Sequence, residues 1–282
     1  MQDPWILLDR LASEDQPCAL ATVIETRGSA SARTGSKAVI DHDGKVVLGW
    51  VGGGCAQSTV CGAALESMHD GATRTVDLNL DDEVLGTGMP CGGSMRVFVE
   101  PLLPRPKLWL LGHGAIAEAI CSFGSALGFQ VIVNDPLAEA ERFPQASRLV
   151  PDDLDYKELQ PGPADYVIVA TQHKGDHHSM LKAARSPCSF IALIASKKRS
   201  GLVLDYLRGE NVTADELAKV HAPAGLDLGA ETPEEIALSV LSEIVQDRRH
   251  GSGTAKRLPD ALGERRRPAR ASSRPPLAAV NE

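Results

Sequence analysis

The chain has 282 residues, of which 43% are hydrophobic and 23% charged, a composition that fits about two globular domains of ordinary size. It contains no apolar run of the ~20 residues that span a bilayer and no basic-then-apolar start typical of a signal peptide, so we expect a cytoplasmic protein without a membrane span. Residues 248–282 carry a net charge of +6, and residues 1–247 carry −14. Because residues 1–247 are this acidic, we do not expect them to bind nucleic acid.

Residues 1–100 predict a small α+β domain with a mostly antiparallel sheet. A short helix is expected over residues 4–12, followed by a strand over 18–26 and a hairpin over 38–49 that turns at Asp43-Gly44. After Gly52-Gly-Gly-Cys55 comes a helical pattern over residues 56–68. Two further strands, residues 73–78 and 94–100, enclose a loop that holds Met89-Pro-Cys-Gly-Gly93.

The proline-rich segment 101–107 predicts a stiff linker, and residues 108–247 then alternate strands with helices. The expected elements are strands over 108–111, 130–134, 166–170 and 190–194, and helices over 115–127 and 233–245. Thr232, Pro233 and Glu235 predict a capped start for the last helix. The sequence therefore predicts an α/β protein in which a small α+β domain precedes a Rossmann-like parallel-sheet domain. Residues 248–282 predict a disordered basic tail.

A dinucleotide-type fingerprint opens the second predicted domain. Gly112-His113-Gly114 and Ala117 follow a strand and begin a helix, and Asp135 ends the next strand. Gly112 permits a tight turn, Gly114 lets a phosphate approach the backbone, Ala117 allows close packing, and Asp135 stands where an acid binds ribose. This pattern favours a nucleotide such as NAD(P), although the same glycines also suit an empty strand–helix turn.

Two glycine–cysteine segments carry the chemistry expected of the first domain. Gly52-Gly53-Gly54-Cys55 leads into a helix, and Cys91-Gly92-Gly93 leads into a strand. Consecutive glycines expose backbone N–H groups that bind anions, and thiolates suit soft metals. Either segment alone fits a turn with a buried cysteine, but together they favour one shared site with Cys55 and Cys91 as metal ligands. Arg33 either adds positive charge there or is solvated.

Other conspicuous residues have simpler interpretations. Cys18, Cys121 and Cys188 have apolar flanks and are expected to be buried in the core. The histidines at 173, 177 and 178 favour a loop at the rim of a site over a metal-binding helix, because Lys174-Gly175 interrupts them. Lys197-Lys-Arg199 predicts a solvated basic loop that could alternatively bind phosphate, and His221 is expected in a strand.

The chain resembles the XdhC/CoxI family of accessory proteins of molybdenum hydroxylases over residues 5 to about 246. The matching N-terminal motifs are Arg33-x-Gly35, Gly52-Gly-Gly-Cys55 and Pro90-Cys-Gly-Gly93. The matching C-terminal motifs are Gly112-x-Gly114, Asp135-Pro, residues 171–176, Ser196-Lys-Lys-Arg199, residues 222–229 and Glu231-Thr-Pro-Glu-Glu-Ile-Ala-Leu-Ser239. The run from Ala222 to Ala237 is far more specific than the Rossmann glycines.

The resemblance implies a chaperone that binds the molybdenum cofactor, as molybdopterin or its nucleotide form, protects it during sulfuration and passes it to a client hydroxylase. It implies cofactor contacts at Cys55 and Cys91, and as partners a cysteine desulfurase, cofactor biosynthesis proteins and a second copy of the chain. One departure is Gln57, where the family usually has Glu, so a carboxylate role is not carried over. The alternative function is an NAD(P)-dependent oxidoreductase that uses the Rossmann domain, but it leaves the two glycine–cysteine segments unexplained.

Overall fold

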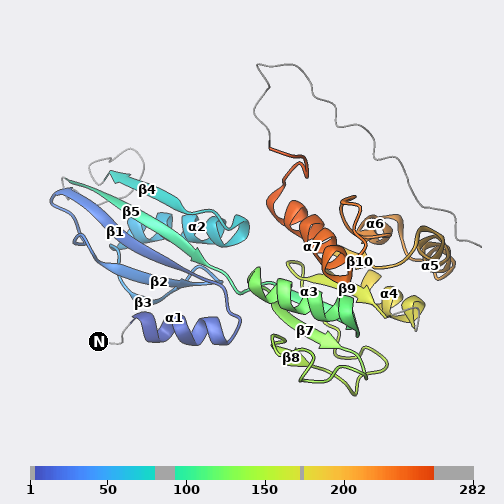
Figure 1. Cartoon of the computed structure of the whole chain (residues 1–282). Helices are drawn as coiled ribbons and strands as arrows, with labels where there is room; N and C mark the ends of the chain where they lie inside the picture. The colour runs from blue at the N-terminus through green and yellow to red at the C-terminus, as the bar shows by residue number, and fades with distance from the viewer. Residues whose placement is uncertain (1–3, 80–92, 172–174, 257–282) are drawn as a thin grey trace, which may run out of the picture.

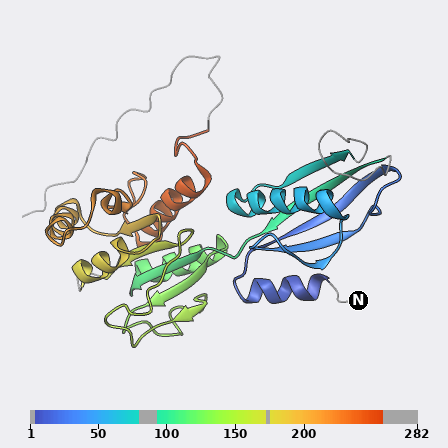
Figure 2. The ribbon, with the colours of Figure 1, turned by 180° about the vertical axis from the view of Figure 1, so that it is seen from behind.

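The computed structural model describes residues 4–79, 93–171 and 175–256 (Figure 1). Two sheets follow one another along the chain and lie side by side, joined by residues 103–106 (Figures 1 and 2). We call residues 4–102 the N-terminal region and residues 107–249 the Rossmann region. Within the described residues, no helix is both long enough and apolar enough to cross a membrane.

The N-terminal region is a five-stranded sheet with a helix on each face. Its elements are α1 (Pro4–Ser13), β1 (Cys18–Gly28), β2 (Lys37–Asp41), β3 (Val46–Gly49), α2 (Gly54–Asp70), β4 (Arg74–Asn79) and β5 (Gly93–Leu102). The strand order is β3-β2-β1-β5-β4, and all pairs are antiparallel, which confirms the predicted sheet and its hairpin. Figure 2 shows α2 and α1 on opposite sides of this sheet.

Two apolar clusters hold the N-terminal region together. Val60 and Ala64 of α2 pack on Val97 and Val99 of β5 and are fully buried with them. The α1 helix covers less of the sheet, because its buried side chains are only Leu8 and Leu11.

The Rossmann region is a six-stranded parallel sheet between helices. Its strands are β6 (Lys107–Gly112), β7 (Gln130–Asn134), β8 (Arg148–Leu149), β9 (Tyr166–Ala170), β10 (Phe190–Leu193) and β11 (Val220–His221). The helices are α3 (Ala115–Ala126), α4 (Asp176–Ala184), α5 (Lys197–Gly209), α6 (Ala214–Ala218) and α7 (Pro233–Arg249). The order β11-β10-β9-β6-β7-β8, with all pairs parallel, is that of a doubly wound dinucleotide fold. The predicted fold class is confirmed.

The two faces of this sheet bury separate cores. Side chains of α3 and α7 pack on one face, and those of α4 and α5 pack on the other. Strands buried on both faces read as continuous apolar runs, which is why Tyr166–Ala170 was predictable with its correct bounds.

Two predicted loops of the Rossmann region are wrong, because each is the first turn of a helix. His177 and His178 lie in α4, and Lys197 to Arg199 begin α5, whose N-cap Ser196 accepts a hydrogen bond from the Arg199 N–H at 3.2 Å. His221 lies in β11, as predicted. The last helix ends at Arg249 rather than at the predicted residue 245. Residues 248 and 249, which were predicted to begin the disordered tail, are therefore helical. His173 and residues 257–282 of the predicted tail lie outside the described residues.

The turn after α1 fixes the junction between the two regions. The Asp15 carboxylate lies 2.8 Å from Lys107 Nζ and accepts a hydrogen bond from Gln130 Nε2 at 3.3 Å. Lys107 and Gln130 begin β6 and β7, so the amino edge of the parallel sheet faces the N-terminal region. The carboxyl ends of β7 and β9 point away from it in Figure 1. The glycine turn of the Rossmann region therefore lies at the far edge of its sheet.

The capping box predicted for the last helix is present, and its loss should be measurable. The Thr232 hydroxyl accepts a hydrogen bond from Glu235 N–H at 3.2 Å, and Glu235 Oε2 accepts one from Thr232 N–H at 3.0 Å. We expect Thr232→Ala to lower the free energy of unfolding by about 1 kcal/mol, since a first-turn N–H loses its partner. Urea unfolding followed by circular dichroism checks this, and an unchanged midpoint would contradict it.

Candidate functional site

The Gly52–Cys55 turn is built so that only glycine fits at its start. Gly52 has a φ of 125°, and a Cβ there would lie 2.9 Å from Met95 Cε and 3.1 Å from Ser31 Oγ. Gly53 is the N-cap of α2 and has no side chain to accept from the first-turn N–H groups. Cys55 is half-buried in that first turn. The positive end of α2 therefore lies beside the Cys55 thiol, and no N-cap side chain bonds to its first-turn N–H groups.

The second glycine–cysteine segment is described only from Gly93 onward, and Cys91 and Gly92 lie outside the described residues. Gly93 begins β5 opposite Gly28, and a Cβ on it would lie 2.5 Å from the Arg27 carbonyl oxygen. Met95, whose methyl group faces Gly52, follows two residues later. The Gly52 turn and the start of β5 are therefore neighbours at one end of the N-terminal region, which we call the distal end.

Arg33 and Gln57 belong to the loop after β1 and to α2, respectively. Arg33 is exposed in the loop after β1, and Ser31 of this loop is the residue that faces Gly52. Gln57 is half-buried near the start of α2. The structure thus brings together Gly52 to Cys55, Gln57 and Gly93, and it places Ser31, two residues before Arg33, against Gly52.

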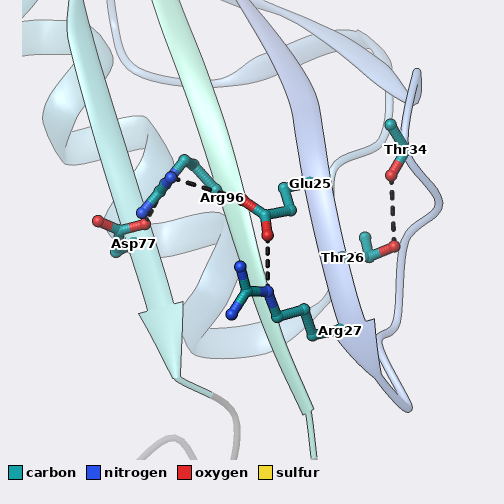
Figure 3. Close-up of polar contacts among 6 residues, drawn as sticks. All are labelled: Glu25, Thr26, Arg27, Thr34, Asp77 and Arg96. Atoms are coloured by element: carbon teal, nitrogen blue, oxygen red, sulfur yellow. Dashed lines mark hydrogen bonds and ion pairs between the residues drawn. The ribbon is translucent and has the colours of Figure 1, made fainter.

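A cavity of about 520 Å³ opens at the distal end beside Gly28 and Gly93. Its charged lining consists of four side chains that the sequence reasoning missed: Glu25, Arg27, Asp77 and Arg96. Figure 3 shows them in a row across β1, β5 and β4, with Arg27 Nε donating to Glu25 Oε1 and Arg96 Nε to Asp77 Oδ1, both at 2.6 Å. The Asp77 hydrogen bond raises the pKa of Arg96. Alternation of polar and apolar residues along β5 was the signal that could have revealed this face.

The Rossmann glycine turn has the predicted strand–turn–helix form. Gly112 has a φ of 142°, and a Cβ there would lie 2.3 Å from the Ala170 carbonyl oxygen of β9. Gly114 is the N-cap of α3, and Ala117 is fully buried against the sheet. Gly112 and Ala117 therefore serve the close packing of strand and helix, whether or not a nucleotide binds.

Asp135 is buried at the end of β7, and His113 of the glycine turn reaches it. His113 Nδ1 lies 3.1 Å from Asp135 Oδ1, which also accepts a hydrogen bond from Leu137 N–H at 2.8 Å. The carboxylate expected to bind ribose thus lies close to a side chain of the turn itself.

A second polar cluster at the carboxyl edge was not predicted as a unit. Asp176 at the start of α4 has a side chain only 3% exposed, accepts a hydrogen bond from the Thr171 hydroxyl, and lies 3.0 Å from Arg199 Nε of α5. This cluster connects the carboxyl end of β9 with the first turns of α4 and α5.

Among the described residues, no group of three or more His, Cys, Asp or Glu could hold a metal ion.

The three cysteines predicted to be structural are confirmed as core residues. Cys18, Cys121 and Cys188 are at most 2% exposed. Burial raises the pKa of all three thiols, that of Cys121 to about 11. They stay protonated and inert at neutral pH.

The predicted site residues fall into two groups that do not meet within one chain. Gly93 and Gly52 lie at the distal end, whereas Gly112, Gly114, Ala117 and Asp135 lie at the carboxyl edge of the other sheet. β1 starts next to the junction and runs to the distal end over 11 residues, roughly 35 Å. The two candidate sites are therefore on opposite sides of the junction.

Comparison with known proteins agrees with this architecture. Residues 11–79 match the XdhC and CoxI family, and residues 108–244 match the XdhC Rossmann domain. The chain belongs to the XdhC and CoxI family. The resemblance inferred from the motifs is confirmed.

The chain is also similar to three curated proteins. "Uncharacterized protein YqeB" of Escherichia coli is 32% identical over 86% of the chain, which spans only 46% of that protein. A probable xanthine dehydrogenase component of Bacillus subtilis is 23% identical over 86% of the chain and 97% of its own length. "Molybdenum cofactor insertion chaperone PaoD" of Escherichia coli is 24% identical over 82% of the chain and 83% of its own.

Residues 222–237, which carried most of the resemblance in the sequence, have a structural role in this chain. Glu243 of α7 accepts a hydrogen bond from Gly225 N–H at 2.6 Å and lies 2.8 Å from His221 Nδ1. The Ser239 hydroxyl donates to the Leu226 carbonyl at 2.6 Å, and a Cβ on Gly225 would lie 2.4 Å from that hydroxyl. The segment is therefore held against α7 by hydrogen bonds and by the close approach of Gly225 to Ser239.

Proposed function

We propose that this protein is a molybdenum-cofactor chaperone, which binds the cofactor, protects it during sulfuration and assists its insertion into a molybdenum hydroxylase. Membership of the XdhC and CoxI family supports the accessory role, and the name of PaoD supports cofactor insertion. Because the chain spans about half of YqeB, nothing is carried over from the remainder of that relative.

The observation that carries the proposal is the proximity of the Gly52 turn to the start of β5. Gly52 faces the Met95 methyl group, and Gly93, the last residue of the second segment, lies against the Arg27 carbonyl, so Gly52 and Gly93 are both at the distal end. A pterin cargo with a phosphate and a dithiolene-bound metal needs backbone N–H donors and soft ligands together. The distal end offers the N–H groups of the first turn of α2 and the thiol of Cys55.

The roles we assign follow from this chemistry. Cys55 and Cys91 contact the molybdenum, Gly52 to Gly54 with Gly92 and Gly93 allow the backbone to approach the cargo, and Arg33 supplies positive charge. Gln57 can donate a hydrogen bond but cannot act as a base at neutral pH. The partners we propose are the client hydroxylase, a cysteine desulfurase, cofactor biosynthesis proteins and a second copy of the chain.

The proposed function is tested on the client rather than on the chaperone. A xanthine dehydrogenase-type hydroxylase is produced in cells with and without this chain, and its molybdenum and cyanide-releasable sulfur are measured per active centre. We expect both to fall several-fold without the chain and to recover with the wild-type gene but not with a Cys55→Ser/Cys91→Ser double variant. Equal metal and sulfur contents with and without the chain would contradict the proposal.

A further inference from the structure

The first turn of α5 carries three successive cations where a helix favours anions. Lys197, Lys198 and Arg199 follow the N-cap Ser196, and this turn has no acidic residue. Positive side chains at the positive end of a helix dipole are unfavourable, and the four first-turn N–H groups themselves attract anions. An arrangement that opposes local stability at a helix terminus is typical of a functional site.

Neighbouring carboxylates do not neutralise this turn completely. Asp176 is paired with Arg199 at 3.0 Å, and Asp135 on the same edge of the sheet is paired with His113 at 3.1 Å. Lys197 and Lys198 are exposed, and neither forms an ion pair within the part of the chain that the structure describes. Two uncompensated charges therefore remain at the start of α5.

A buried hydroxyl in the same turn gives independent support for a ligand. Ser200 is only 2% exposed, and its Oγ has no hydrogen-bond partner among the described residues. Ser200 is the fourth residue of α5, and in an α-helix the Cα–Cβ bond leans toward the preceding turn, which here is the first. A buried hydroxyl without a partner is destabilising, and a bound anion would supply the missing acceptor.

The position of the turn in the fold matches a ligand site. α5 follows β10 and α3 follows β6, and these strands flank β9 in the sheet, about 10 Å apart. Both helices therefore begin at the carboxyl edge, on either side of the point where the strand order reverses, which is where open α/β sheets bind ligands.

We propose that the first turn of α5 binds the phosphate of a nucleotide-type ligand, with Lys197 and Lys198 as charge partners and the Ser200 hydroxyl as a hydrogen-bond donor. Arg199 is held by Asp176 and positions the turn. Because this site lies in the Rossmann region, it can be tested independently of cofactor binding at the distal end.

The lysines are tested by calorimetric titration of the whole protein with ADP and with inorganic pyrophosphate. We expect saturable binding that Lys197→Ala/Lys198→Ala weakens at least about tenfold, since two charge partners of the phosphate are lost. The matched control is Lys182→Ala/Arg208→Ala, which removes two charges from the last turns of α4 and α5 and should change the Kd less than twofold. Tighter binding of ADP than of pyrophosphate identifies a nucleotide, and equal binding identifies a free phosphate compound.

Ser200→Ala separates ligand binding from a purely structural role. Removing an unpartnered buried hydroxyl should raise the Tm of the free protein by a few degrees. The same change should weaken ADP or pyrophosphate binding several-fold. The proposal is overturned if neither probe binds saturably at millimolar concentration, if the Lys197/Lys198 variant and the Lys182/Arg208 control weaken binding equally, or if Ser200→Ala leaves the Kd unchanged.

Discussion

Gly112→Ala is expected to lower the free energy of unfolding of the Rossmann region by about 4 kcal/mol, which is among the largest effects of a single substitution. The added Cβ would lie 2.3 Å from the Ala170 carbonyl oxygen and 2.5 Å from its carbonyl carbon, and the φ of 142° is unfavourable for any L side chain. Because both clashing atoms belong to the backbone of β9, the added methyl group fits only if β6 and β9 move apart. Urea unfolding monitored by tryptophan fluorescence measures the loss, because Trp109 lies in β6.

Gly62→Ala is the matched control. Gly62 is exposed in the middle of α2, and a Cβ there meets nothing within 4 Å. Alanine is a better helix former than glycine, so this variant should be more stable by about 0.5–1 kcal/mol. A Gly112→Ala protein with wild-type stability would show that β6 and β9 are not so closely packed.

Cys55→Ser and Cys91→Ser are each expected to lower the retention of molybdenum cofactor at least about tenfold, because each removes a proposed soft ligand. The double variant should lose little more than either single variant, since residues that share one ligand are not additive. Retention is measured as molybdopterin and molybdenum per chain after purification from cofactor-producing cells.

Cys18→Ser and Cys188→Ser serve as controls for this pair, because both thiols are buried in the cores away from the distal end. They should lower stability modestly and leave cofactor retention near that of the wild type. Additive losses from Cys55 and Cys91 would indicate two separate sites rather than one.

The fold was predictable where sequence patterns are governed by burial. The apolar runs of β7 and β9 gave the correct bounds, and Thr232, Pro233 and Glu235 marked the start of α7. The α4 and α5 helices were missed because their first turns are rich in histidine or lysine, which resembles a solvated loop. Tertiary contacts stabilise these two turns as helix, chiefly the pairing of buried Asp176 with Arg199.

The candidate site was predictable as residue types but not as an arrangement. Glycine repeats indicated close backbone approach at Gly52, Gly93 and Gly112, and each has backbone or side-chain atoms where a Cβ would stand. The sequence does not reveal that the junction at Asp15 places the first two on the opposite side of the molecule from Gly112. The charged row of Glu25, Arg27, Asp77 and Arg96 was missed because its members come from three strands.

Cofactor content of the wild-type protein tests the central claim most directly. The chain is co-expressed with the molybdenum cofactor biosynthesis genes and purified anaerobically. Molybdopterin is then quantified by the fluorescence of its oxidised derivative, and molybdenum by mass spectrometry. We predict molybdopterin and molybdenum in equal amounts in the wild type, and a large loss of both in the Cys55→Ser/Cys91→Ser variant. Wild-type protein free of molybdopterin, or a double variant that retains the wild-type content, would contradict a cofactor chaperone that uses these two cysteines.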